Sequence, residues 1–353
     1  MQSIVFRSRI RAGKQLEELD SVAKGKEARI LRIVVPVFND WESLRTLLQD
    51  LDQVASSLPV RISITVVNDG STIPLEADFQ ECLHLEHVDG IQIIHLITNL
   101  GHQRALAVGL CVAVEDGDCD AILVMDADGE DSPHAISDML HAAGDSSDFC
   151  VVARRGKRSE NFTFKLSYLV YKLLFKLLTG RKIAFGNFCL LSRGFARRLV
   201  CIPDLWNNLP AAVLRSKLPI REVPIDRARR YAGESKMSFT TLVVHGLSGL
   251  SVYAETIFAR FLILTLVLFL VSGASISLVL TLRIFFPKYA TPGWASTVSF
   301  GISIILVQTL SFTLSFILML LNSRVQRLVI PFAEYKQYVD SRQTLLAPVL
   351  DEI

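Results

Sequence analysis

The 353-residue chain lacks the paired cysteines that mark a disulfide framework or a zinc site. Its six cysteines lie apart, with no C-x-x-C pair, so we expect reduced and mostly buried thiols. It also lacks G-x-G-x-x-G after its first apolar run and any G-K-[ST] loop, which argues against a dinucleotide dehydrogenase or a P-loop NTPase. With a formal net charge of +2 and no long basic patch with interleaved aromatics, nucleic acid is not an expected partner.

Charge is missing from two long stretches near the C-terminus, residues 261–282 and 289–323. A helix needs roughly 20 apolar residues to cross the hydrocarbon core of a bilayer, and each stretch is long enough. We predict a transmembrane hairpin over 258–323, with spans at 261–282 and about 294–321. Two buried core helices are the alternative, although apolar runs of this length are rare in water-soluble folds.

Two spans return the chain to the side from which it started. Basic residues on that side outnumber those at the turn: Arg260, Arg324, Arg327 and Lys336 against Arg283 and Lys288. The positive-inside rule therefore favours a cytoplasmic catalytic domain and cytoplasmic termini, including a tail over 324–353. Residues 1–30 form a polar leader without the apolar segment of a secretory signal peptide, which agrees with that expectation.

The part before the hairpin alternates apolar runs with helical patterns. We predict strands at 33–37, 62–67, 92–96, 121–125 and 149–153, and helices that include 41–51 and 102–114. This alternation is typical of an α/β fold with a doubly wound, mostly parallel sheet, here over residues 31–237. In such sheets ligands bind beyond the carboxyl ends of the strands.

An acidic cluster follows the fourth predicted strand. Asp126 and Asp128 are two residues apart and can reach one cation together, with Glu130 close behind. Hard oxygen ligands at an open site suit Mg²⁺ or Mn²⁺, which commonly bind carboxylates together with substrate phosphates. The acidic cluster therefore predicts a binding site for a nucleotide diphosphate. An acidic loop that only caps the helix beginning near His134 is the alternative.

Polar loops also follow the other predicted strands. They are F-N-D at 38–40, N-D-G-S at 68–71, N-L-G-H at 99–102 and R-R at 154–155. Each loop alone is an ordinary turn or helix cap. Five of them, counting the acidic cluster, all placed at the expected edge of one sheet, indicate a binding site.

Seven segments in order resemble the family 2 glycosyltransferases of the GT-A fold. Within that family the chain is similar to the dolichol-phosphate-mannose-synthase-like and bacterial polyprenyl-phosphate enzymes with two C-terminal membrane helices. The resemblance covers about residues 31–325. The segments are V-P-V-F-N at 35–39, V-N-D-G-S at 67–71, N-L-G-H-Q at 99–103, D-A-D-G-E-D-S-P at 126–133, A-R-R at 153–155, G-N-F-C-L-L-S-R at 186–193 and G-E-S-K-M-S at 233–238.

The resemblance implies roles for individual residues. The nucleotide and sugar would contact Pro36, Phe38, Asn39, Asp69, Gly70, Gln103 and Asn187. The metal ion would be held by Asp126, Asp128 and Glu130 on the donor diphosphate, with Asp128 also counted as catalytic. A cationic rim of Arg154, Arg230, Ser235 and Lys236 would meet the acceptor phosphate or the leaving diphosphate, with Arg154 and Lys236 counted as catalytic. Charge that builds on a departing nucleoside diphosphate is stabilised by such cations.

Asn187 departs from the family pattern, because many relatives have Asp in this G-D-F segment and that Asp is sometimes assigned a base role. Asn takes up no proton at neutral pH. A phosphomonoester, with its second pKa near 6, is already largely ionised and needs no base to attack. Asn187 therefore favours a lipid phosphate over a hydroxyl as the acceptor.

Two further segments are predicted to lie at the membrane surface. Residues 162–178 combine apolar residues with Lys165, Lys172 and Lys176 on one helical face, as in an interfacial helix. A core helix with snorkelling lysines is the alternative. Residues 238–257 lead into the first span and form a second candidate.

The sequence thus predicts an inverting, membrane-bound enzyme that moves a hexose from UDP- or GDP-hexose to an undecaprenyl or dolichyl phosphate. A lipid hydroxyl or polysaccharide acceptor is an alternative, although the Q-x-x-R-W motif of processive synthases is absent. An inactive membrane scaffold of the same fold is a second alternative. The base, the sugar, the prenol length and a homo-oligomeric state stay open.

Overall fold

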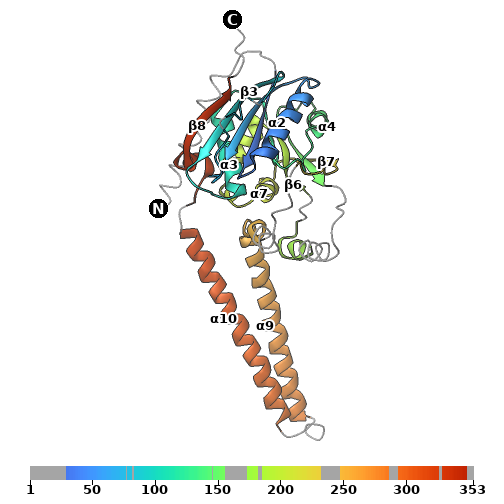
Figure 1. Cartoon of the computed structure of the whole chain (residues 1–353). Helices are drawn as coiled ribbons and strands as arrows, with labels where there is room; N and C mark the ends of the chain where they lie inside the picture. Colours follow the sequence, from blue (N-terminus) through green and yellow to red (C-terminus); the bar gives the residue numbers. More distant parts are fainter. Residues whose placement is uncertain are drawn as a thin grey trace. The chain divides into compact units, whose positions relative to one another are not determined.

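The computed structural model describes residues 29–76, 78–81, 83–144, 146–155, 173–181, 185–231, 247–285, 293–325 and 328–347. The chain divides into two compact units. The first contains residues 1–169, 183–252 and 328–353, and the second contains 170–182 and 253–327. Each unit is described by itself (Figure 1).

The first unit is built on a sheet of eight described strands in the order β7-β5-β6-β4-β1-β2-β3-β8. The strands are β1 (Ile30–Val37), β2 (Arg61–Asn68), β3 (Val88–Leu96), β4 (Ala121–Val124), β5 (Cys150–Arg155), β6 (Phe185–Ser192), β7 (Arg221–Ile225) and β8 (Val339–Leu346). All five predicted strands are confirmed. The pairing shows that six strands run in one direction, whereas β6 and β8 run in the other.

Helices cover both faces of the sheet. They are α2 (Trp41–Ala55), α3 (His102–Asp116), α4 (Ala135–Ala143), α6 (Arg193–Leu199) and α7 (Leu209–Arg215), with a 3-10 turn η1 (Pro203–Trp206). The central strands are apolar along most of their length because they are covered on both sides, as is typical of parallel sheets. The two predicted helices are confirmed as α2 and α3.

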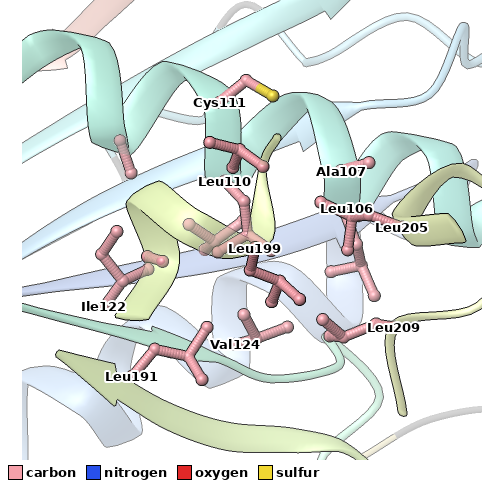
Figure 2. Packing of buried hydrophobic residues seen from close by; sticks show 14 of the residues in the cluster. Leu106, Ala107, Leu110, Cys111, Ile122, Val124, Leu191, Leu199, Leu205 and Leu209 are labelled. Carbon is pink, nitrogen blue, oxygen red and sulfur yellow. The ribbon is translucent and has the colours of Figure 1, made fainter. Parts of the chain in front are cut away.

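Helix α3 is the most deeply packed helix, since every residue from 105 to 114 is buried. Figure 2 shows Leu106 and Leu110 of this helix beside Leu199, Leu205 and Leu209, with Ile122 and Val124 of the sheet close by. Gly109 lets the helix approach the sheet closely. A Cβ atom there would lie 2.5 Å from Val34 Cγ1 and 2.7 Å from Val67 Cγ2.

Residues 331–346, which the sequence analysis treated as part of a tail, form the last elements of the sheet unit. They are α11 (Pro331–Glu334), the 3-10 turn η3 (Tyr335–Tyr338) and β8, which pairs antiparallel with β3 (Figure 1). Glu115 of α3 contacts both Tyr335 and Lys336. Arg342 Nη1 donates to Asp116 Oδ1 at 2.9 Å. These contacts fix the C-terminal segment to the end of α3.

The second unit contains two long helices, α9 (Ala254–Phe285) and α10 (Trp294–Val325). Both are candidate membrane spans, with mean hydropathy of 2.5 for Ala254–Phe285 and 2.3 for Trp294–Asn322. Only 6% and 0% of their most apolar windows are buried, whereas helices of a soluble core would be mostly buried. The two helices pack through a Thr265–Thr313 hydroxyl contact of 2.8 Å and the stacked rings of Phe261 and Phe316.

The two predicted interfacial helices lie largely outside the described residues. Of 162–178, only 173–178 are described, as part of a helical turn that ends at residue 179. In that turn Phe175 is buried and packs edge-on against Tyr253, whereas Leu173 and Leu177 are exposed. Of 238–257, the first nine residues lie outside the described part. Both helices stay predictions.

The packing of α3 predicts the effect of Gly109→Ala. The added methyl would meet two β-branched side chains that have little room to move, so the free energy of unfolding should fall by about 1–3 kcal/mol. Thermal unfolding in detergent measures this change. Gly273→Ala on α9 is the matched control, because nothing lies within 4 Å of its added Cβ. An equal effect of the two variants would contradict the close approach of α3 to the sheet.

Candidate active site

The carboxyl ends of six strands meet at one edge of the sheet, because β1, β2, β3, β4, β5 and β7 share one direction. The polar loops predicted to gather there follow these strands directly. Strand β7 adds a segment that the sequence analysis did not place, residues 226–231, which begins at the same edge.

Asn39 ties the loop after β1 to the loop after β2. Its backbone has a positive φ of 53°. Its Oδ1 accepts hydrogen bonds from the backbone N–H groups of Thr72 and Ile73, at 2.8 and 2.9 Å, and its own N–H donates to Ser71 Oγ at 2.9 Å. Asn39 therefore holds the loops after β1 and β2 together. Its contact with the nucleotide stays a prediction.

Asp69 holds the start of α3. Its Oδ1 accepts from Leu100 N–H at 2.7 Å and its Oδ2 from Gly101 N–H at 3.0 Å. The residue is only 3% exposed, and burial raises the pKa of its carboxyl although these hydrogen bonds oppose the shift. Beside it Gly70 has a φ of +65°, and a Cβ there would lie 2.5 Å from the Asn99 nitrogen. Asp69 and Gly70 therefore keep the loops after β2 and β3 in close contact.

A groove of about 550 Å³ opens where these loops meet β8. Two predicted residues, Phe38 and Gly70, line it, and the Phe38 ring is 43% exposed. Pro36 lies buried within β1, opposite Val67 of β2. The other lining residues are Asn68, Ser71, Thr72, His95, Leu96, Ile97, Thr98, Asn99, Asp340 and Ser341.

The acidic loop after β4 lies against residues 226–231. Arg230 Nη2 is 2.8 Å from Asp128 Oδ2, and Arg230 Nε donates to Glu130 Oε1 at 3.0 Å. Arg227 pairs with the other oxygen of Glu130. Two backbone bonds, from Tyr231 N–H to the Asp128 carbonyl and from Ala228 N–H to the Glu130 carbonyl, both 3.1 Å, hold the two segments together.

Gly129 is required for this contact. It has a φ of +83°, and a Cβ there would lie 2.6 Å from the ring of Tyr231. The Tyr231 hydroxyl donates to Asp50 Oδ2 of α2 at 2.6 Å. The acidic loop is therefore held between a helix and the segment that follows β7.

The electrostatics of the acidic loop favour a bound cation. Burial raises the pKa of the Asp128 carboxyl, and the neighbouring charge of Asp126 raises it further. Within the described residues no three His, Cys, Asp or Glu side chains are gathered closely enough to hold a metal ion. The guanidinium of Arg230 is the positive charge that two of the three predicted ligands contact. Carboxylate oxygens are ligands that Mg²⁺ and Mn²⁺ prefer, but their present spacing does not form a metal site, so Asp126, Asp128 and Glu130 stay the predicted ligands.

A chain of hydrogen bonds fixes Asn187. The backbone N–H of Leu209 donates to Gln103 Oε1 at 2.7 Å, so Gln103 presents its amide nitrogen, which donates to Asn187 Oδ1 at 3.0 Å. Asn187 therefore turns its own Nδ2 toward His102 Nε2, 2.9 Å away. The predicted pair Gln103 and Asn187 is thus brought together.

His102 connects the hydrogen bonds of Gln103 and Asn187 to the acidic loop, since its Nε2 is 3.2 Å from Asp126 Oδ1. Burial lowers its pKa, but the charge of Asp126, with those of Asp69 and Asp128, outweighs burial and raises the pKa of His102 overall. The two contacts of Nε2 are alternatives: the protonated nitrogen donates to Asp126, and the neutral one accepts from Asn187.

The remaining predicted residues are less well placed. Arg154, at the end of β5, is exposed, with its Nη1 3.9 Å from Glu222 Oε2. Ser235 and Lys236 lie outside the described residues. The residues that the sequence analysis did not list are His102, Arg227 and Asp340. His102 stands in the N-L-G-H-Q segment and could have been found there, whereas nothing in the sequence pairs Arg227 with Glu130 or Asp340 with Phe38.

The sequence of this chain is similar to those of known glycosyltransferases. Residues 32–199 match "Glycosyl transferase family 2". The chain is 28% identical over 284 residues to the uncharacterized glycosyltransferase YkoT of Bacillus subtilis, covering 76% of this chain and 80% of that protein. It is 26% identical over 222 residues to the undecaprenyl-phosphate 4-deoxy-4-formamido-L-arabinose transferase of Proteus mirabilis, covering 60% and 64%.

Among solved structures, glucosyl-3-phosphoglycerate synthase from Mycobacterium tuberculosis matches with 14% identity and a TM-score of 0.46. The match covers 69% of this chain and 83% of that one. That protein was solved with Mn²⁺, UDP-glucose and phosphoglyceric acid. Mannosyl-3-phosphoglycerate synthase from Rubrobacter xylanophilus matches with 15% identity and a TM-score of 0.47.

The hydrogen bonds of Asp69 predict a structural cost for Asp69→Asn. The amide nitrogen of Asn would face one of the two backbone N–H groups and leave it without an acceptor, so the free energy of unfolding should fall by about 1–3 kcal/mol. Thermal unfolding of the full chain in detergent measures it. The exposed Asp138→Asn serves as the control. Equal unfolding temperatures for the two variants would contradict the structural role of Asp69.

Proposed function

We propose that this chain, whose residues 32–199 match the family 2 glycosyl transferases, transfers a hexose from a nucleotide-diphosphate sugar to a polyprenyl phosphate, with inversion at the anomeric carbon. The observation that carries the proposal is the acidic loop at the carboxyl edge of the sheet, with cationic Arg230 against Asp128 and Glu130. Arg230, and a metal ion if the carboxylates bind one, would stabilise the negative charge of a diphosphate there.

The donor diphosphate binds at the acidic loop in this proposal. Asp126, Asp128 and Glu130 would hold Mg²⁺ or Mn²⁺, which when bound stabilises the charge of the leaving nucleoside diphosphate. Arg230, which now neutralises Asp128, is then available to bind a diphosphate oxygen. Arg154 and the Ser235-Lys236 pair are proposed to meet the acceptor phosphate. The groove beside Phe38 would take the base of the nucleotide.

The lipid phosphate acceptor is supported by the state of Asn187. Its amide is bound to Gln103 and faces His102, and it has no proton-accepting group at neutral pH. An acceptor that is ionised before it binds needs no base at this position. One relative, which this chain matches over 64% of its length, is an undecaprenyl-phosphate transferase, and its name agrees with this class of acceptor.

The pairing of β8 with β3 supports the proposed membrane arrangement. Residues before and after the α9–α10 segment belong to the same sheet. An even number of crossings is needed for this, and two candidate spans supply it. Together with the excess of basic residues on that side, this supports a catalytic sheet and chain termini in the cytoplasm.

Replacement of Asp128 tests the donor site. Asp128→Asn keeps the size of the side chain but removes its charge, so kcat should fall by about 10²-fold or more while the protein stays folded. Transfer of labelled hexose to undecaprenyl phosphate measures it, with Asp138→Asn as the control. EDTA should abolish wild-type activity and Mg²⁺ or Mn²⁺ should restore it. Full activity in excess chelator would contradict the assignment of a metal ion to this site.

Asn187→Asp tests the acceptor. With a lipid phosphate already ionised, a carboxylate at this position adds no needed base and brings like charge toward the attacking phosphate, so the rate should stay the same or fall. Transfer by both forms is measured from pH 5 to 8. A gain on the order of 10²-fold that rises as the new carboxyl ionises would instead indicate a hydroxyl acceptor.

A further inference from the structure

We propose that Asp340, on the strand that follows the membrane hairpin, binds the base of the nucleotide donor and selects guanine or uracil over adenine and cytosine. This inference rests on the proposed function, because it assumes that the donor is a nucleotide sugar. It adds a specificity residue from a part of the chain that lies beyond the matched residues 32–199.

The local backbone presents Asp340 to the groove. Along β8, Ser341 pairs with His95 and Val339 pairs with Leu96, so Asp340 between them has no partner on β3. An extra residue of this kind is a β-bulge, and bulges re-aim side chains beside binding sites. Asp340 is exposed, and its carboxylate accepts one long hydrogen bond, 3.4 Å, from the hydroxyl of its neighbour Ser341.

Several other polar groups near the groove already have partners. Asn68 Oδ1 accepts from Ser71 N–H at 2.9 Å, and its Nδ2 lies 3.0 Å from His95 Nδ1. The Thr72 hydroxyl is held by Asn39 at 3.0 Å. Asp69, to which the sequence analysis gave contact with the base or sugar, has both oxygens on backbone N–H groups.

Asp340 is therefore the one acidic side chain among the described residues that line the groove. Its carboxylate also has room for further hydrogen bonds, since an ionised carboxyl group accepts at about four sites.

The groove is connected to the acidic loop by a short stretch of chain. Asn99 lines the groove, and His102, three residues later, lies 3.2 Å from Asp126. The groove and the acidic loop therefore lie at the same edge of the sheet. In this proposal a base beside Phe38 and Asp340 extends its diphosphate along that edge toward Asp126 and Asp128.

The chemistry of a carboxylate decides which base fits. An ionised carboxylate only accepts hydrogen bonds. Guanine offers the adjacent N1–H and 2-amino donors, and uracil offers N3–H. At the same edge adenine and cytosine present a ring nitrogen lone pair, which a carboxylate repels, so that only their exocyclic amino group is left to donate. Phe38, with its half-exposed ring at the same groove, supplies an apolar surface for stacking.

The test measures dissociation constants of GDP, UDP, ADP and CDP for the full chain in detergent with Mg²⁺, by calorimetry. The wild type should bind GDP or UDP about 10-fold or more tightly than ADP and CDP, since each charge-assisted hydrogen bond at an exposed site has this order of effect. Asp340→Asn should reduce the preference about 10-fold. Part of the change should be tighter binding of ADP and CDP, because the Asn amide donates to a ring nitrogen. Asp138→Asn should keep the wild-type preference.

The outcomes separate the two proposals. A preference unchanged by Asp340→Asn, or a uniform loss of affinity for all four nucleotides, would overturn the role of Asp340 and leave the proposed function intact. If the wild type binds none of the four, the proposed function fails and this inference fails with it. Thermal unfolding of the variant confirms that β8 stays paired.

Discussion

The arrangement of this site depends on how the negative charge of residues 126–131 is balanced. Four carboxylates in six positions repel one another, and burial makes the ionised form of Asp128 more costly. Three of them have partners from other parts of the chain: His102 for Asp126, Arg230 for Asp128, and Arg227 with Arg230 for Glu130. The fourth, Asp131, accepts the backbone N–H of Asp126 at 3.1 Å and so folds the loop on itself.

Polar side chains at this edge divide into two groups by the kind of partner they have. Asp69, Asp131 and Asn39 bind backbone N–H groups, which are costly to leave unpaired. Asp128 and Glu130 bind flexible arginine side chains, which other charges can replace. The first group determines the shape of the loops, and the second is the group that must exchange partners if the proposed function is correct.

The burial of each strand explains which strands the sequence could predict. Strands covered on both faces, such as β1, read as apolar runs, and all five predicted strands of this kind are present. Strand β8 has one buried residue, Leu345, so its sequence reads as a polar tail. It is held by contacts more than 200 residues apart, such as Arg342 with Asp116, which no local pattern reveals.

The roles of single residues were harder to predict, because they too depend on contacts between residues far apart in the sequence. The N-D-G-S segment indicates a ligand site, but only the fold shows that Leu100 and Gly101 already use both oxygens of Asp69. Conversely, nothing near Asp340 in the sequence suggests a binding residue, because its neighbours in the groove come from the ends of β1, β2 and β3. Motifs identified which loops form the site, and the backbone bonds decide which of their side chains stay available.

Strand β8 also shows how the two candidate membrane spans are connected to the sheet unit. Since residues 183–252 and 328–353 fall in the same unit, the two helices are inserted in the sequence of that unit rather than following it. A chain cut before α9 would lose β8 with the helices and leave the edge of β3 unpaired, a template for aggregation. It would also lose the contacts of Arg342 with α3 and the carboxylate of Asp340. A soluble form that keeps the complete sheet must therefore replace the hairpin by a linker between Tyr253 and Leu328, rather than end before it.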